Sequence, residues 1–109
     1  MLNQIAMDKV FLALAQPHRR SIVEDLCGGP ASVSSLAAHH DLTLAAVLQH
    51  VQFLEASGLV STKKSGRVRT CYLESKALES AQNWFASRKL LWERRLDQLD
   101  AMLAADKQN

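Results

Sequence analysis

The stretch VSSLAAHHDLTLAAVLQHVQFLEASGLVSTKKSGRVRTCYL, residues 33–73, decides the fold. A short helical pattern over about 33–39, with Leu36 and Ala37 inward, leads into the tight connection His40-Asp41-Leu42. A second helical pattern begins after Thr43, whose hydroxyl is placed to cap it, and stops at Gly58. Two helices joined by so short a connection predict a helix-turn-helix.

The period of the pattern then changes from 3.6 to 2. Two runs rich in β-branched residues, 59–64 and 67–73, flank Ser65-Gly66, and a tight turn with glycine between such runs predicts a β-hairpin. A basic hairpin directly after a helix-turn-helix is typical of a winged helix-turn-helix. That fold places the helix after Thr43 in the major groove of double-stranded DNA.

Two further helices are predicted before this stretch. Residues 3–15 keep the three-and-four spacing of an apolar face. Pro17 suits the first turn of the next helix, and Gly28 is expected to end it in the left-handed conformation. We therefore predict one mainly helical domain over 1–109, with a small β-hairpin, for DNA binding and dimerisation.

A helical pattern returns over about 75–105 and predicts a helix about 45 Å long. A domain of this size has a radius of gyration of about 13 Å, so such a helix should overhang it. We predict a homodimer through this helix and the first one; the alternative is one broad helix that faces its own core. The predicted dimer residues are Leu2, Ile5, Phe11, Trp84, Phe85, Leu91, Trp92, Leu96, Leu99 and Leu103.

Positive charge is concentrated on the hairpin, which we call the wing. The chain has 13 basic and 11 acidic side chains, but residues 59–73 carry four basic and no acidic ones. Lysine and arginine side chains release counterions from DNA when they contact its phosphates, so the four basic residues of the wing are predicted phosphate contacts. The alternative is a solvent-exposed hairpin whose charges only increase solubility. The four basic residues are Lys63, Lys64, Arg67 and Arg69.

The helix after Thr43 has no basic residue. If Val47, Val51 and Leu54 face the core, Leu44 and Leu48 form one exposed apolar ridge. Glutamine pairs with adenine, and leucine suits thymine methyl groups. The predicted base contacts are Thr43, Leu44, Ala45, Leu48, Gln49 and Gln52. In the alternative, the ridge binds another protein and DNA binding has been lost.

Composition excludes several classes of protein. Of the 109 residues, 48% are hydrophobic, yet no apolar run approaches the roughly 18 residues of a membrane helix. Two cysteines without a C-x-x-C pair fit a reducing cytoplasm. The sequence has no glycine-rich phosphate loop, H-E-x-x-H motif or nucleophile elbow, so we predict neither an enzyme nor a cofactor.

Several short motifs, taken in order, resemble the arsenic-repressor (ArsR-type) family of bacterial winged-helix regulators. LAQPHRR, residues 14–20, resembles the opening of the family's second helix, with Gln16 where a better capping residue is usual. AVLQHV and LEASGLV, from residues 46 and 54, resemble the recognition helix and first wing strand. Leu48-Gln49 with WERRLD, residues 92–97, resembles one subgroup, in which proline commonly replaces Ala45.

This resemblance implies a homodimeric repressor on an inverted-repeat operator, with a releasing signal that is often a metal. The family's known metal sites are absent. Residues 31–35 lack the Cys-x-Cys of one type, and the last helix has no histidine. Its Glu93, Asp97 and Asp100 interleave with arginines, which favours a solvated ion-pair face.

Histidine and cysteine side chains offer few other sites. The rings of His39 and His40 should diverge by about 100° on a helix, so we predict no shared metal. His50 is interpreted as a packed position. Cys71, beside basic residues, is a sensor candidate if its thiol pKa is lowered, or else a small buried hydrophobe. Cys27 lies at a helix C-terminus, which disfavours a thiolate.

Overall fold

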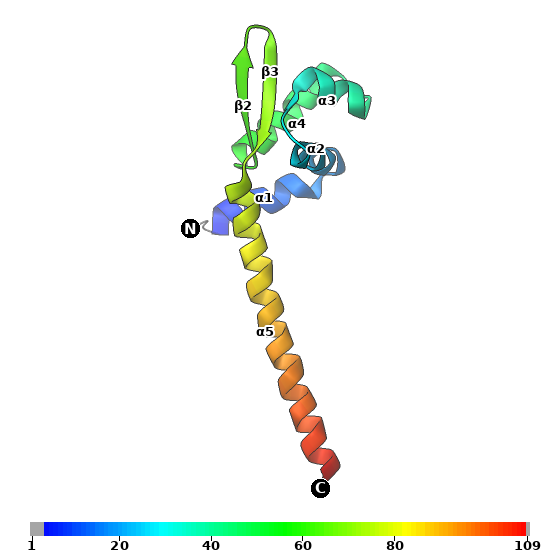
Figure 1. The fold of residues 1–109 in the computed structure, drawn as a ribbon, viewed down its shortest axis with the longest axis vertical. Coiled ribbons are helices and arrows are strands. Elements are labelled where there is room, and N and C mark those ends of the chain that lie inside the picture. The colour runs from blue at the N-terminus through cyan, green and yellow to red at the C-terminus, as the bar shows by residue number, and fades with distance from the viewer. Residues whose placement is uncertain (1–3, 109) are drawn as a thin grey trace.

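The computed structural model describes residues 4–108, with side chains for 6–107 (Figure 1). Helices account for most of it, as predicted, and a small antiparallel sheet accompanies them. In chain order the elements are α1 (Gln4–Ala15), α2 (Pro17–Cys27), β1 (Ala31–Ser32), α3 (Val33–His40), α4 (Leu44–Ala56), β2 (Val60–Ser65), β3 (Val68–Leu73) and α5 (Ser75–Gln108).

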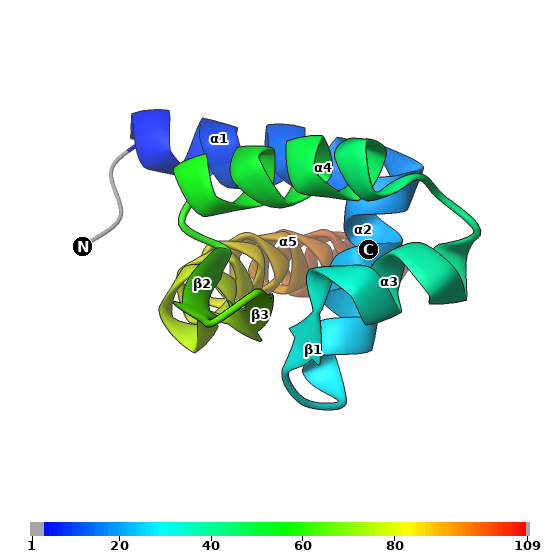
Figure 2. The same ribbon diagram turned by 90° about the horizontal axis from the view of Figure 1, so that it is seen from above.

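The core lies where α1 to α4 meet the sheet and the first turns of α5. Figure 2 shows α4 alongside α1, with β2 and β3 close to the start of α5. The predicted inner face of α4 is confirmed, because Val47, Val51 and Leu54 are fully buried. The largest fully buried side chains are Ile22, Leu36, Leu54, Leu59, Val10, Val47, Val51 and Cys71.

Side-chain caps begin three of the helices. Ser32 and Thr43 accept hydrogen bonds from the backbone N–H groups of Ser35 and Ala46, each at 3.1 Å. Gln16 also caps its helix, because its Oε1 accepts from the Arg19 N–H at 2.8 Å. A longer side chain thus satisfies the same free N–H that a shorter cap would.

The end of α2 differs from the expectation. Gly28 has φ −83° and lies in the right-handed region, and it is Gly29 that has positive φ, at 137°. The Gly28 N–H donates to the Asp25 carbonyl at 3.0 Å, so the chain continues one residue further before it reverses. Two consecutive glycines leave this choice open in the sequence.

The sheet contains one strand that the sequence analysis did not predict. Its order is β1-β3-β2, and Ala31 and Ser32 of β1 pair with Cys71 and Thr70 of β3. Two residues are too few to show a period, so β1 has no signal of its own. The hairpin itself is confirmed; its turn residues are Gly66, with φ 61°, and Arg67, one position later than predicted.

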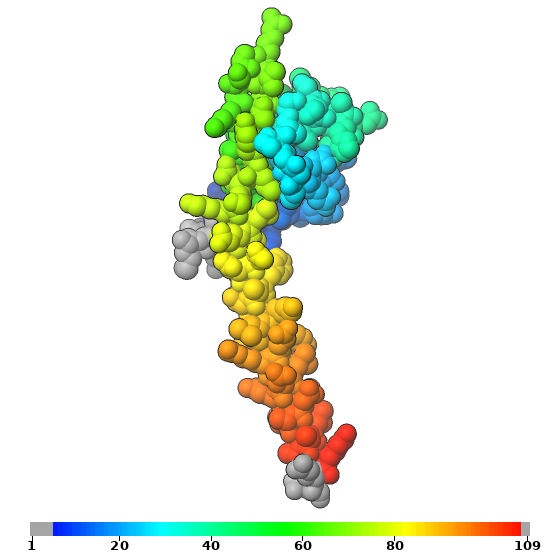
Figure 3. Space-filling view, in the orientation of Figure 1, coloured from blue at the N-terminus to red at the C-terminus, as the bar shows by residue number. Residues whose placement is uncertain are grey.

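Helix α5 leaves the body of the molecule after about two turns. Ala77 and Ala81 are buried, whereas every residue from 82 to 107 is exposed (Figures 1 and 3). The molecule measures 75 × 29 × 21 Å and has a radius of gyration of 20.0 Å, against about 13 Å for a compact chain of this length. The predicted overhang is therefore confirmed.

Within residues 4–108, no helix combines the length and hydropathy that crossing a lipid bilayer requires.

Candidate nucleic-acid interface

The turn between α3 and α4 sets the direction of α4. Asp41 adopts the left-handed conformation, with φ 52°, and Leu42 donates from its N–H to the Ala37 carbonyl at 3.0 Å. Aspartate tolerates this conformation better than most residues. The chain therefore ends α3 and starts α4 at Thr43 within three residues.

The outward face of α4 is polar and apolar in turn, without basic residues. Thr43, Leu44, Ala45, Gln49 and Gln52 are exposed, and Leu44 keeps 51% of its surface. The predicted apolar ridge is only half present. Leu48 is partly buried and packs against the core, because its position borders the inward face of α4.

The wing places three of its basic residues on two paired strands and the fourth, Arg67, in the turn between them. Lys63, Lys64 and Arg67 are exposed, whereas Arg69 is partly buried. Lys64 on β2 is the cross-strand partner of Arg69 on β3, which brings two positive charges together. Lys63 lies over the Tyr72 ring, 5.7 Å from its centroid, within the range of a cation–π contact.

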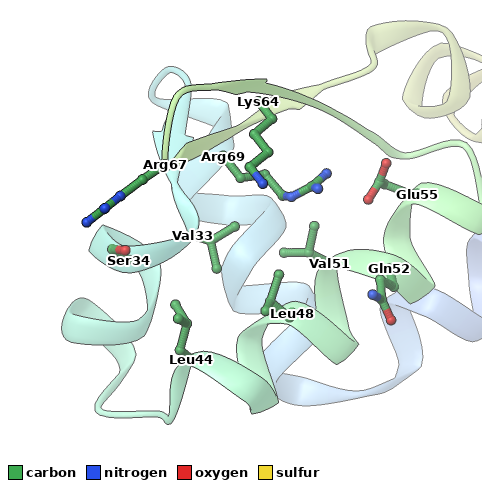
Figure 4. Close-up of a pocket in the computed structure, with 10 residues that line it drawn as sticks. All are labelled: Val33, Ser34, Leu44, Leu48, Val51, Gln52, Glu55, Lys64, Arg67 and Arg69. Atoms are coloured by element: carbon green, nitrogen blue, oxygen red, sulfur yellow. The ribbon is translucent and has the colours of Figure 1, made fainter.

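A cleft of about 410 Å³ separates the wing from α3 and α4. Figure 4 shows Lys64 and Arg69 reaching into it from the wing, with Leu48 and Val51 below and Arg67 pointing away from it. Its full lining is Val33, Ser34, Leu44, Leu48, Val51, Gln52, Glu55, Lys64, Arg67 and Arg69. The cleft thus brings predicted base contacts and predicted phosphate contacts onto one face of the molecule.

One acidic residue in this cleft was missed by the sequence analysis. The Arg69 Nη1 donates to the Thr62 hydroxyl at 3.0 Å, and that hydroxyl donates to the Glu55 carboxylate at 3.2 Å. This chain of hydrogen bonds joins α4 to both wing strands. Arg69 is therefore held in place by the Thr62 hydroxyl, which in turn binds Glu55.

Comparison with known proteins identifies the family. A family model described as a helix-turn-helix domain matches residues 14–62. The crystal structure of an ArsR family transcriptional regulator has a TM-score of 0.78 and 41% identity, and the match covers 84% of this chain and 94% of that chain. This chain belongs to the ArsR family of transcriptional regulators. The predicted winged helix-turn-helix is thus confirmed, and the chain belongs to a family of regulators, not enzymes.

Two sequence relatives agree with this ArsR-family assignment. The HTH-type transcriptional regulator Rv2034 of Mycobacterium tuberculosis is 37% identical over 71 residues, which are 65% of this chain and 66% of the relative. The transcriptional repressor SdpR of Bacillus subtilis is 27% identical over 78 residues, which are 72% of this chain and 87% of the relative.

The arginines of the ArsR-like PHRR motif have a structural role in this regulator. Arg19 donates from Nε and Nη2 to the carbonyls of Ala13 and Leu12 at 2.9 and 3.0 Å, and Arg20 donates to that of Leu14 at 2.9 Å. These carbonyls end α1 and have no helical partner. Arg19 also lies 4.0 Å from the Phe53 ring centroid, which links α1, α2 and α4.

His50 of this ArsR-family chain is partly buried on α4. Its ring stacks on His18, with 5.8 Å between centroids. Burial lowers the pKa of His50, and the charges of His18 and Arg19 lower it further. The ring therefore favours the neutral form, in keeping with its interpretation as a packed residue.

The interpretation of Cys71 as a small buried hydrophobe is confirmed. Its side chain, on strand β3 of the wing, is fully buried. Burial raises the pKa of Cys71, Glu55 raises it further, and Arg69 opposes them. A thiol with a raised pKa stays protonated and unreactive near neutral pH, which speaks against a sensor role for Cys71. Cys27 is exposed.

The predicted dimer residues of this ArsR-family chain are exposed along α5, whereas Phe11 of α1 is partly buried. Leu2 and the side chain of Ile5 lie outside the described part. Phe11 packs edge-on against Trp84 and Phe85, at 5.7 Å from each ring centroid. Exposed apolar side chains then continue along α5: Trp84, Phe85, Leu91, Trp92, Leu96, Leu99 and Leu103.

Two expectations about charged groups on the helices have different outcomes. Glu93, Asp97 and Asp100 are exposed, and Glu93 pairs with Lys89 at 3.9 Å, which fits a solvated ion-pair face.

The predicted divergence of the two adjacent histidines is wrong. Nε2 of His40 and Nε2 of His39 lie 2.6 and 3.7 Å from one carboxylate oxygen of Asp25.

Proposed function

We propose that this ArsR-family regulator is a cytoplasmic repressor that binds an inverted-repeat operator as a homodimer. The observation that carries the proposal is the cleft, which is lined both by Gln52 and apolar residues of α4 and by basic residues of the wing (Figure 4). An α-helix fits the major groove of DNA, and a basic hairpin beside it meets the phosphates of the backbone.

Base reading is assigned to α4. Gln49 and Gln52 each offer an amide that pairs with adenine N6 and N7. Exposed Leu44 and Ala45, with the accessible part of Leu48, suit thymine methyl groups. Thr43 is exposed, and because its hydroxyl oxygen caps α4 by accepting from the Ala46 N–H, its O–H hydrogen and its methyl group are left to contact DNA.

Phosphate contact is assigned to the wing. Lys63, Lys64 and Arg67 are free to follow the DNA backbone, and Arg69 supports them from a fixed position. Dimerisation through α1 and α5 gives two such units related by a two-fold axis. Their α4 helices then enter successive major grooves about 34–36 Å apart.

The alternative is a protein-interaction module without DNA binding. Exposed Leu44 favours that alternative on its own, because an apolar side chain on a surface also suits a protein partner. Selection of bound sequences from a random duplex pool distinguishes the two. We expect enrichment of an inverted repeat, with adenine and thymine at the positions that face α4. If no sequence is enriched at low salt, repression through an operator is ruled out.

Removing wing charges should reduce the salt dependence of DNA binding. The variants Lys64→Ala and Arg67→Ala are each expected to lower the slope of log K against log salt by about one unit, because each phosphate contact releases about one counterion. The measurement is fluorescence anisotropy with duplex DNA over a salt series. Lys107→Ala, in the last turn of α5, is the matched control and should leave the slope unchanged. An equal effect of the control variant would contradict the assignment.

Neutralising Glu55 should strengthen DNA binding. The variant Glu55→Gln keeps an acceptor for the Thr62 hydroxyl and removes a negative charge from a cleft that faces phosphates. We expect affinity for random duplex DNA to rise about three- to tenfold at low salt, with the gain shrinking as salt increases. Asp106→Asn makes the same charge change at the far end of α5 and should have no effect. Weaker binding by Glu55→Gln would show that holding Arg69 matters more than the repulsion.

A further inference from the structure

Three potential metal ligands meet where the end of α2 contacts the end of α3. They are Asp25, in the last turn of α2, and His39 and His40, in the last turn of α3. One ligating atom from each lies within 4.8 Å of the others, and among the described residues no other group of three or more meets this condition. None of the three residues lines the DNA cleft or belongs to the predicted dimer surface, although His39 and His40 lie at the other end of α3 from Val33 and Ser34 of the cleft.

The two imidazoles approach the carboxylate from different directions. Their rings are nearly perpendicular, at 87°, with centroids 5.0 Å apart. Both Nε2 atoms nevertheless point at the same Asp25 oxygen, at 2.6 and 3.7 Å. A helix rotates adjacent residues by about 100°, so convergence requires both side chains to bend toward α2.

These distances bracket those of a tetrahedral metal site. With bonds of about 2.0–2.1 Å, zinc ligands lie about 3.3 Å from one another. The His40–Asp25 pair is shorter than this and the His39–Asp25 pair is longer, so side-chain movements of about 1 Å would admit an ion. His39 is free to make such a movement, because 69% of its side chain is exposed.

We propose that Asp25, His39 and His40 bind one divalent transition-metal ion of the zinc type. Two imidazoles and one carboxylate suit Zn²⁺ and leave its fourth position open to water on the exposed side. The ion would tie α2 to the end of α3, one residue before the left-handed Asp41 that begins the turn into α4. This proposal revises the prediction of no metal site, and it is independent of the proposed repressor function.

The proposal is tested by titrating the purified chain with Zn²⁺ and measuring the heat of binding by isothermal titration calorimetry. We expect one ion per chain, and at least a tenfold loss of affinity in His39→Gln and in Asp25→Asn. His39→Gln is the decisive variant, because an exposed side chain is replaced without disturbing the core. Histidine binds metals only when it is deprotonated, so affinity should also fall as the pH decreases.

Two control variants make the outcome specific. His18→Gln removes an exposed histidine of α2 that is outside the cluster, and Cys27→Ser removes the exposed thiol near Asp25; both should bind Zn²⁺ normally. With Co²⁺ in place of Zn²⁺, visible absorption bands should report tetrahedral ligation in the unaltered chain and disappear in His39→Gln. No binding at about 100 µM free Zn²⁺, or unchanged affinity in His39→Gln, would overturn the proposal.

Discussion

Replacing Leu96 and Leu99 together by glutamate is expected to convert a dimer into a monomer and to abolish tight operator binding. Both side chains lie on the exposed apolar surface of α5, together with Trp92 and Leu103. Each leucine buried in an interface contributes about 1.5–3 kcal/mol to the free energy of dimerisation, and in a two-fold symmetric dimer each residue is present twice. A buried, unpaired carboxylate costs several kcal/mol more. The dimer dissociation constant should therefore rise by a factor of about 10³ or more.

Sedimentation equilibrium at micromolar concentration measures this effect, and operator binding is measured in parallel. The matched control places two glutamates at Ala101 and Ala104, which lie on a side of the same helix away from Leu91, Leu96 and Leu99. That variant should remain dimeric. If the unaltered chain itself sediments near 12.1 kDa, the proposed dimer is wrong.

A loss of DNA affinity in the glutamate variant has a geometric reason. A single α4 reads only a few base pairs, whereas two linked units bind two half-sites at the entropic cost of one association. The monomer should still bind random DNA weakly through its wing, because Lys63, Lys64 and Arg67 are unaltered. Residual binding without sequence preference is therefore the expected result.

Truncating Leu54 to alanine should cost about 3 kcal/mol of unfolding free energy. Leu54 is fully buried on the inner face of α4, and its carbonyl accepts from the Ser57 hydroxyl at 2.7 Å and from the Leu59 N–H at 3.1 Å. Its neighbourhood is therefore held rigidly and cannot collapse to fill a cavity. For a chain of this length the midpoint of thermal unfolding should fall by about 12–24 °C.

Urea denaturation at a fixed protein concentration measures the change, because a dimer's stability depends on concentration. Leu44→Ala is the matched control, since it makes the same truncation on the same helix at a side chain that is 51% exposed. It should change stability by less than about 0.5 kcal/mol. Similar losses in the two variants would contradict the assignment of inner and outer faces to α4.

Much of the fold follows from local patterns. The spacing of Val47, Val51 and Leu54 identified the buried face of α4, and Thr43 was correctly placed as its cap. The alternation after Gly58 predicted the wing, and the length of the last pattern predicted that α5 would overhang the body. Each of these features depends on residues within a few turns of one another.

The candidate site was predicted less completely. The basic residues of the wing and the amides of α4 were found, but Glu55 was not, because its link to Thr62 and Arg69 depends on how the wing folds back against α4. The direction of the pKa shift at Cys71 was left open by the sequence for the same reason. Its sequence neighbours are basic, but burial and Glu55 determine the shift.

By itself, the sequence determined the order of the helices and the hairpin, the inward faces, the Thr43 cap of α4 and the charge of the wing. Those properties depend on short-range periodicity and composition. Only the tertiary structure decided that β1 pairs with β3, that Arg19 and Arg20 satisfy the last carbonyls of α1, and that His39 and His40 meet at Asp25. These are contacts between different elements. The directions of the side chains involved are set by packing, so the contacts produce no repeating pattern in the sequence.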